Sequence, residues 1–334
     1  MKWNKFTKNN ILLFNNKYLL ENNNILLTTI KEERTNIKNY IRNLKLNINI
    51  TTIDNNDMDI KKFCNVSWVD MKGVIKELNT IDITYKIMWN NNIIIIRTTL
   101  EQFKYVKKQL NIIIYMIEYL KFKSDNMNKN VMIYLILTNL KKEFPNKSHM
   151  SIKNANSGYT DLDKDIIFIW RYEEFEKVLF HELMHFFNMD TRNHDFDNHI
   201  NTKGIDPSYY EVFTDFLGII YHIIFISIIT KIKIKTLLEL EIAFIENQAM
   251  ILNNYLKLKN WNSKPKKVIK QTSPAFSYYI LKYMLFNYAT KNDVMKYILE
   301  DKTNILLKEI ISEGFIMKPF IKIKSSRMTL LQLK

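Results

Sequence analysis

The chain has few of the residues that cross-link a backbone or turn it sharply. Cys64 is the only cysteine among 334 residues, so no internal disulfide can form and thiolates cannot build a metal site. Glycine and proline occur only five times each, which is unusual for a globular chain. A single thiol fits a reducing compartment, and we therefore expect an intracellular, cytoplasmic protein.

The sequence also lacks a long apolar segment of the kind that targets or spans a membrane. The stretch 1–17 has only a short, Asn-flanked ILLF run, whereas a signal peptide needs a longer apolar region. The longest apolar run, Phe216 to Thr230, contains His222 and is shorter than the roughly 20 residues that cross a bilayer. We expect no membrane span.

Positive charge, by contrast, is plentiful, with 49 Lys and Arg against 34 Asp and Glu and a formal net charge of +15. Such a charge often indicates nucleic acid or an anionic membrane as partner. Lys, Ile and Asn dominate the composition and share A/T-rich codons, so genomic base bias, as in some large DNA viruses and intracellular parasites, predicts the same surplus. No run interleaves Arg with aromatic residues, and we expect no specific nucleic-acid partner.

The motif that organises the chain is His181-Glu182-Leu183-Met184-His185, an HExxH pattern. Residues four apart lie on one face of a helix, so both imidazoles can reach a single metal ion. Glu182 is rotated by about 100° from His181. Its carboxylate would lie beside the ion, where it can take a proton from the attacking water.

A helix over this motif has local support. Glu173, Glu174 and Glu176 would place negative charge in the first turn, where the helix dipole favours it. Apolar side chains flank the histidines on both sides, so we expect a buried helix. Ionisable groups on a buried helix need partners because burying them unpaired is costly. This argument favours a metal site over the alternative, a chance occurrence of a short motif.

The residues before the motif predict a small sheet. Val131–Thr138 and Ile166–Trp170 are apolar runs of strand length and predict buried strands. Between them, the polar stretch Ser151–Thr160 predicts an edge strand that contains Asn154 and Ala155. A substrate peptide can add to such an edge as a further strand, while a plain surface loop is the alternative for these residues.

The N-terminal part predicts an α+β region of unknown role. Short apolar runs between Asn clusters favour β-rich or mixed structure over residues 1–60, whereas the apolar spacing over Leu100–Lys123 predicts a helix. The polar segment 123–130 is the best candidate boundary. We therefore expect two domains, residues 1–126 and residues 127–334.

A second helix is expected after the motif. Asn188 suits a left-handed helix end, and Asp206-Pro207 suits the start of a new helix. That helix would carry Glu211 and Asp215 one turn apart on one face. Sharing a site with the HExxH helix is the simplest way to satisfy these buried groups.

A catalytic zinc ion takes three protein ligands and leaves one position for water, so the two histidines need a third partner. The metzincin pattern requires Gly and His where this chain has Asn188 and Thr191, and it is excluded. The remaining candidates are His194 and His199 in the polar connection, and Glu211 on the next helix.

Glu211 with Asp215 four residues later resembles the ExxxD pattern of gluzincin metallopeptidases. The order of strand, edge strand and HExxH helix over residues 131–230 is similar as well. The resemblance implies that Zn²⁺ is bound by His181, His185 and Glu211, and that Asp215 hydrogen-bonds a zinc-binding histidine.

The resemblance also bears on substrate binding and has limits. Asn154-Ala155 is similar to the dipeptide with which thermolysin-like gluzincins hold the peptide backbone, which implies substrate contact at these residues. The chain departs from the thermolysin-like group in the spacing between His185 and Glu211, and in Tyr210, which stands where that group has Asn. The subfamily and the substrate therefore stay open.

Together these patterns predict an α+β fold in which a small mixed sheet places its edge strand next to the HExxH helix, followed by a mainly helical C-terminal subdomain. The expected function is a zinc metallopeptidase, a hydrolase of protein or peptide substrates with Glu182 as general base. The reaction needs a further donor for the oxyanion. The candidates are Tyr278, Tyr279, Tyr209, Tyr210 and His222, and we favour Tyr278 or Tyr279 because the apolar helix after Pro274 can fold back over the site.

Two alternatives to a peptidase remain open. One is a catalytically inactive protein of metallopeptidase-like fold that binds nucleic acid or anionic surfaces through its basic side chains. The other is an HExxH enzyme that attacks carbonyl groups other than peptide bonds. Zinc content and chelator-sensitive cleavage of a protein substrate distinguish the first alternative from the expected peptidase.

Overall fold

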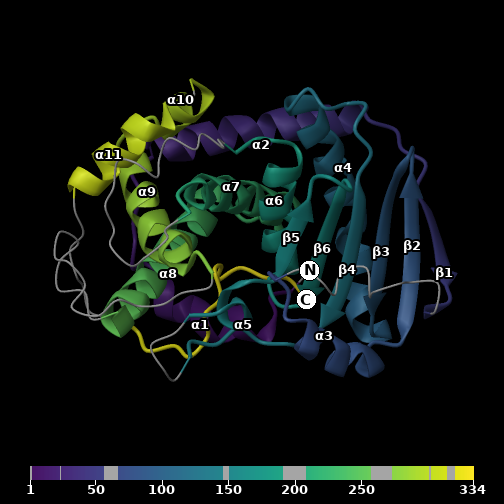
Figure 1. The fold of residues 1–334 in the computed structure, drawn as a ribbon. Helices are drawn as coiled ribbons and strands as arrows, with labels where there is room; N and C mark the ends of the chain where they lie inside the picture. Colours follow the sequence, from purple (N-terminus) through teal and green to yellow (C-terminus); the bar gives the residue numbers. More distant parts are fainter. Residues whose placement is uncertain are drawn as a thin grey trace.

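A six-stranded sheet and a group of helices packed on it make up the computed structural model (Figure 1), which describes residues 2–22, 24–55, 67–145, 150–190, 208–256, 273–300, 302–313 and 320–334. The strands are β1 (Asn49–Ile53), β2 (Ile83–Trp89), β3 (Asn92–Thr98), β4 (Met132–Thr138), β5 (Gly158–Asp161) and β6 (Ile166–Arg171). The helices are α1 (Lys5–Phe14), α2 (Ile25–Asn43), α3 (Met71–Glu77), α4 (Leu100–Lys123), α5 (Ile152–Ala155), α6 (Phe175–Phe186), α7 (Tyr210–Thr230), α8 (Ile234–Leu256), α9 (Lys282–Ala289), α10 (Val294–Leu299) and α11 (Thr303–Glu313). A 3-10 turn (Leu78–Thr80) follows α3, and a π-helical segment (Ser277–Leu281) leads into α9. The expected α+β fold with a mixed sheet and a helical C-terminal region is confirmed.

The strands are ordered β1-β2-β3-β4-β6-β5. β4 lies parallel to both β3 and β6, while the other neighbours are antiparallel. Ile133 and Ile169 belong to the main core with α4, α6 and α7, whereas Phe168 and Trp170 belong to a smaller core with α3. Both faces of the central strands are therefore covered, which explains why their sequences are continuously apolar.

The short strand β5 forms one edge of the sheet, beside α6 (Figure 1). The predicted edge strand over Ser151–Thr160 is only partly right, because residues 152–155 form the helical turn α5 and the strand begins at Gly158. Asn154 causes the difference. Its Oδ1 accepts hydrogen bonds from the backbone N–H of Ser151, at 3.0 Å, and from the Ser151 hydroxyl, at 2.9 Å, and these bonds close a turn.

Of the β-rich or mixed structure expected over residues 1–60, the mixed alternative is found, because this region holds α1 and α2 and, among the described residues, one named strand, β1. The asparagines start the helices here. Asn4 accepts a hydrogen bond from the backbone N–H of Thr7, and Asn24 accepts one from that of Leu27, as N-cap residues do. Burial of an apolar stripe then stabilises α2, although its local sequence has a low helix propensity.

The later helices agree well with the sequence predictions. α4 spans Leu100–Lys123 as predicted, and Asn188 has the predicted left-handed conformation with φ 53°. The predicted helix start at Asp206-Pro207 lies outside the described residues, and α7 is described from Tyr210. α11 was not predicted from the sequence.

Residues on both sides of the expected boundary at 126 and 127 contribute to one sheet, because β3 pairs with β4. α2 packs against α4, α7 and α8, so the N-terminal region also shares the main core. By its length and composition, α7 could cross a membrane, but most of its apolar stretch is buried inside the fold. It packs in the main core against α4, α6, α8 and α9.

Glu176, on α6, gives the fold a pH-dependent stability. Its side chain is fully buried, and burial raises the pKa of this carboxyl from 4.5 to about 7. A raised pKa in the folded state stabilises the protein below about pH 4.5, and this contribution is lost as the pH rises through about 7. The neutral amide of Glu176→Gln should therefore make the protein more stable than the wild type at pH 8, by up to about 3 kcal/mol, and the difference should shrink toward pH 5.

Urea denaturation at pH 5 and pH 8 measures this effect. The exposed Glu32→Gln variant is the control and should change the stability by no more than about 0.5 kcal/mol, as surface substitutions usually do. A Glu176→Gln effect of equal size at both pH values would contradict the expectation.

Candidate metal centre

The HExxH helix begins where β6 ends, at a tight backbone turn. Glu174 immediately precedes α6 with φ 64°, and its Oε1 accepts the backbone N–H groups of Met328, at 2.6 Å, and Thr329, at 2.7 Å. The expected position of Glu173 and Glu174 in the first turn is wrong, since α6 starts at Phe175. The C-terminal segment thus holds the start of the helix that carries the histidines.

His181, His185 and Glu211 come together between α6 and α7. The Oε2 atom of Glu211 lies 3.2 Å from Nε2 of His181 and 3.5 Å from Nε2 of His185. One ligand atom from each of the three residues lies within 4.8 Å of the others, which is the size of a site that can hold a metal ion. The two helices approach closely because Gly218 faces α6, where a Cβ atom would stand 3.0 Å from the Cα atom of His181.

The outer nitrogens of both imidazoles have carboxylate partners. Nδ1 of His181 lies 3.1 Å from Oδ1 of Asp215, and Nδ1 of His185 lies 2.5 Å from Oδ2 of Asp190. A carboxylate on Nδ1 favours the tautomer whose Nε2 lone pair is free to bind a metal. Both Nε2 atoms face Oε2 of Glu211. Once both imidazoles are neutral, the donor set of two imidazoles and one carboxylate fits zinc.

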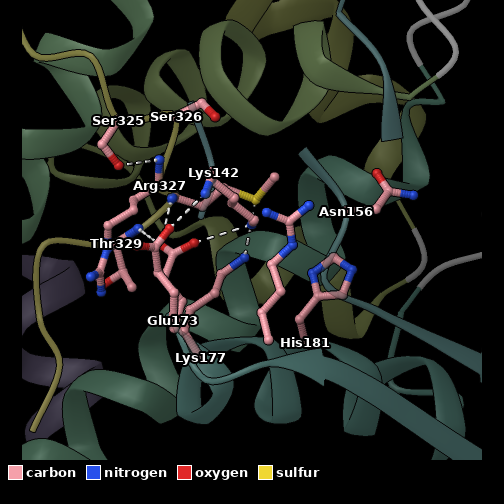
Figure 2. Close-up of polar contacts among 12 residues, drawn as sticks. Lys142, Asn156, Glu173, Lys177, His181, Ser325, Ser326, Arg327 and Thr329 are labelled. Carbon is pink, nitrogen blue, oxygen red and sulfur yellow. Dashed lines mark hydrogen bonds and ion pairs between the residues drawn. The ribbon is translucent and has the colours of Figure 1, made fainter. Parts of the chain in front are cut away.

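Two buried lysines contact the Asp215 carboxylate together with His181. Nζ of Lys177 is paired with Oδ1, and Nζ of Lys282 lies 2.8 Å from Oδ2. All three side chains are almost completely buried, so this cluster depends on the balance of its charges. Figure 2 shows Lys177, Lys142 and His181 among the polar residues of this region. Sequence reasoning found Asp215 but missed Lys177, Lys282 and Asp190.

The site favours a cation. Burial lowers the pKa of His181 to about 3. Burial also disfavours a charge on His185, but Glu211 and Asp190 outweigh it and raise the pKa of His185 to about 10. The positive charge of His185, opposing the effect of burial, lowers the pKa of Glu211. A divalent ion can replace the proton on His185, because metal binding requires neutral imidazoles.

Glu182 lies beside this group and contacts the edge strand. Its Oε2 accepts a hydrogen bond of 2.8 Å from the Thr160 hydroxyl, and burial raises its pKa to about 7. Gly158 also approaches it closely, since a Cβ atom there would lie 2.8 Å from Oε1. Glu182 therefore lies between the metal-binding atoms and the edge of the sheet.

A cleft of about 370 Å³ opens over the group. Its lining comes from the edge strand, both helices and neighbouring loops, namely Trp68, Asn156, Gly158, Tyr159, Thr160, Leu162, His181, Glu182, His185, Ser208, Tyr210, Glu211, Pro274 and Tyr278. Tyr278 reaches the cleft with its ring 5.9 Å from that of His181, and burial together with the charge of Glu211 raises its pKa well above the usual value. Its hydroxyl keeps its proton and can donate a hydrogen bond.

Tyr279 points away from the cleft, contrary to its place among the expected oxyanion donors. Its hydroxyl donates to the carbonyl of Ser326, and its ring packs 5.8 Å from that of Phe144. Of the other tyrosines considered, Tyr210 lines the cleft, with its ring 6.1 Å from that of His185. The donor candidates that line the cleft are therefore Tyr278 and Tyr210.

The remaining predicted residues lie away from the group. Asn154 donates its amide to the carbonyl of Glu143, at 2.8 Å. Ala155 is buried and lines a small cavity that also touches His181 and Glu182. Neither lines the main cleft, whereas Asn156 and Gly158, shortly after them in the chain, do. The alternative metal ligands His194 and His199 lie outside the described residues, and His222 is buried on α7 and does not line the cleft.

The sequence matches no protein-family model, and neither the curated proteins nor the solved structures include a match to this chain.

Proposed function

We propose that this protein is a zinc-dependent peptidase of the gluzincin type. The observation that carries the proposal is the convergence of His181, His185 and Glu211 within 4.8 Å, with Glu182 beside them at the floor of the cleft. The carboxyl group of Glu182 is buried next to these residues, and burial raises its pKa. Such a perturbed group in a cleft is typical of a functional site. The position of Glu182 suits proton transfer.

His181, His185 and Glu211 would hold the zinc ion. When bound, the ion would act as a Lewis acid that polarises the peptide carbonyl and lowers the pKa of water. Glu182 accepts the proton of the attacking water and passes it to the leaving amine. The Thr160 hydroxyl holds the Glu182 carboxylate through Oε2, and Asp215 and Asp190 hold the two imidazoles.

The substrate peptide would lie along β5. This strand pairs with β6 on one side, and its other side has no strand partner in the part of the chain that the structure describes. An extended peptide can use the free backbone groups of β5 and cross the cleft beside Glu182. Tyr278 lines the cleft, and in this proposal its hydroxyl stabilises the oxyanion that develops on the carbonyl.

Metal content and chelator sensitivity test the proposal. Elemental analysis should find about one zinc ion per chain, and a casein-type assay should show cleavage that stops with a chelator and returns when zinc is added. Bound zinc without cleavage of casein or peptides would contradict the peptidase and favour a binding protein. Absence of zinc from protein purified without chelators, and failure to take it up, would contradict the metal site itself.

A further inference from the structure

A second large cavity lies where the two ends of the chain meet the turn that leads into α6 (Figure 1). Its walls come from α1, the loop after β4, the turn between β6 and α6, and residues 323–332. Among the described residues, it shares no lining residue with the cleft over the metal centre. Its volume of about 550 Å³ exceeds the 370 Å³ of that cleft and is typical of cavities that bind small molecules.

Cations outnumber carboxylates in the lining of this cavity. The basic side chains are Lys5, Lys141, Lys142, Lys324 and Arg327, and the acidic ones are Glu143 and Glu173. Glu173 pairs with Lys141 at 3.6 Å. Glu174, which is buried and outside the lining, pairs with Lys142 at 3.1 Å and lies 3.8 Å from Nε of Arg327. The buried basic groups are thus partly neutralised from inside the fold.

The exposed basic groups of the cavity are not neutralised in this way. Lys5, at the start of α1, and Lys324, in the C-terminal segment, form no ion pair within the part of the chain that the structure describes. Glu143 is the one lining carboxylate for which the same holds. Because the opening therefore carries an excess of positive charge, it attracts an anion.

Arg327 adds a hydrogen-bond donor whose position is fixed. Its side chain is buried, and its Cζ atom lies 4.4 Å from the centroid of the Phe6 ring. Nη2 donates to Oε1 of Gln332 at 2.8 Å, whereas Nη1 has no acceptor among the described residues. Figure 2 shows Arg327 together with Lys142 and Glu173. A guanidinium group held in this way is suited to an anion with several oxygens.

We propose that this cavity binds a small molecule that carries a phosphate group. Lys5 and Lys324 would contact the phosphate at the opening, and Arg327 would offer a further donor from the wall. A phosphate group presents three oxygens and up to two negative charges, so it can satisfy donors from separate segments at once. The inference goes beyond the proposed peptidase and does not depend on it.

Calorimetric titration of the full-length protein with inorganic phosphate, pyrophosphate and ATP tests the proposal. The protein is first treated with a chelator and freed of it, so that no metal ion contributes to binding. At about 0.15 M salt, which screens weak surface attraction, at least one probe should bind at one site per chain with a Kd below about 1 mM. Tighter binding of ATP than of pyrophosphate would identify an organic phosphate as the ligand, and the reverse order an inorganic one.

Four lysine variants assign the binding to the cavity. Lys5→Gln and Lys324→Gln should each weaken it about tenfold, because each removes a charged donor. Lys8→Gln on α1 and Lys322→Gln in the C-terminal segment are the matched controls. They remove the same charge from exposed residues outside the lining and should change the affinity less than about threefold. All four lysines are exposed, so the fold should tolerate these substitutions.

A substitution of opposite sign completes the test. Glu143→Gln removes the unpaired carboxylate of the lining and should tighten binding about two- to fivefold, whereas the exposed Glu32→Gln on α2 should leave it unchanged.

Two results would overturn the inference. One is the absence of saturable binding by all three probes. The other is binding that Lys5→Gln and Lys324→Gln weaken no more than Lys8→Gln and Lys322→Gln do, because the anion would then be attracted by the general positive charge of the surface. Neither result bears on the proposed peptidase, and a protein without zinc or hydrolytic activity could still bind phosphate here.

Discussion

The Glu182→Gln variant is expected to bind zinc as the wild type does and to hydrolyse peptides about 10²- to 10⁴-fold more slowly. Glutamine has nearly the shape of glutamate and can keep the hydrogen bond from the Thr160 hydroxyl. It cannot accept the proton of the attacking water. Zinc content by elemental analysis and kcat at saturating peptide measure the two parts of the expectation.

Glu176→Gln provides the matched control for this experiment. Glu176 lies on the same helix and is equally buried, but it does not line the cleft, so its substitution should leave kcat unchanged. Normal cleavage by Glu182→Gln would show that another group is the base. Loss of zinc from Glu182→Gln would show that Glu182 acts in metal binding and not only in proton transfer.

The Asp215→Asn variant is expected to lose about 3–5 kcal/mol of stability and about 10- to 100-fold of zinc affinity. The stability falls because Lys177 and Lys282 would remain buried beside a neutral amide. The zinc affinity falls because an amide is a weaker acceptor than a carboxylate for Nδ1–H of His181. Urea denaturation of the metal-free protein and zinc titration measure the two effects separately.

A double substitution separates the two roles of Asp215. In Asp215→Asn with Lys282→Met, one uncompensated cation is gone, so much of the lost stability should return while zinc affinity stays low. Strictly additive losses of stability would contradict the idea that Lys282 and Asp215 stabilise each other as a buried ion pair. Unchanged zinc affinity in Asp215→Asn would contradict its contact with a metal-binding histidine.

The residues that meet at the candidate metal centre could be predicted because each lies on a helix with a clear period. The four-residue spacings from His181 to His185 and from Glu211 to Asp215 fix which side chains share a face. Asp190 could not be found in this way, since it follows the end of α6 and its position depends on how the chain turns there. Contacts made outside regular structure leave no period in the sequence.

Other differences have equally specific causes. The π-helical segment Ser277–Leu281 changes the helical spacing around Tyr278 and Tyr279, so a 3.6-residue pattern cannot decide which ring enters the cleft. Lys177 and Lys282 lie far apart in the sequence, and their pairing with one carboxylate is a tertiary contact. In α1 and α2, asparagine acts as an N-cap where the pattern of apolar runs suggested strand breaks.

The order in which the chain is synthesised has a consequence for when the centre can form. Residues 326–333 are buried, and their backbone supports Glu174 at the start of α6 and receives the Tyr279 hydroxyl. Trp3 forms an antiparallel β-bridge with Leu333, so this segment also lies against the N-terminal residues (Figure 1). A nascent chain on the ribosome carries every metal-binding side chain once residue 211 is made, yet it lacks the support for α6 until more than a hundred further residues have followed. In the proposed peptidase, hydrolysis would thus begin only after residues 326–333 have been made, and partly made chains would be inactive.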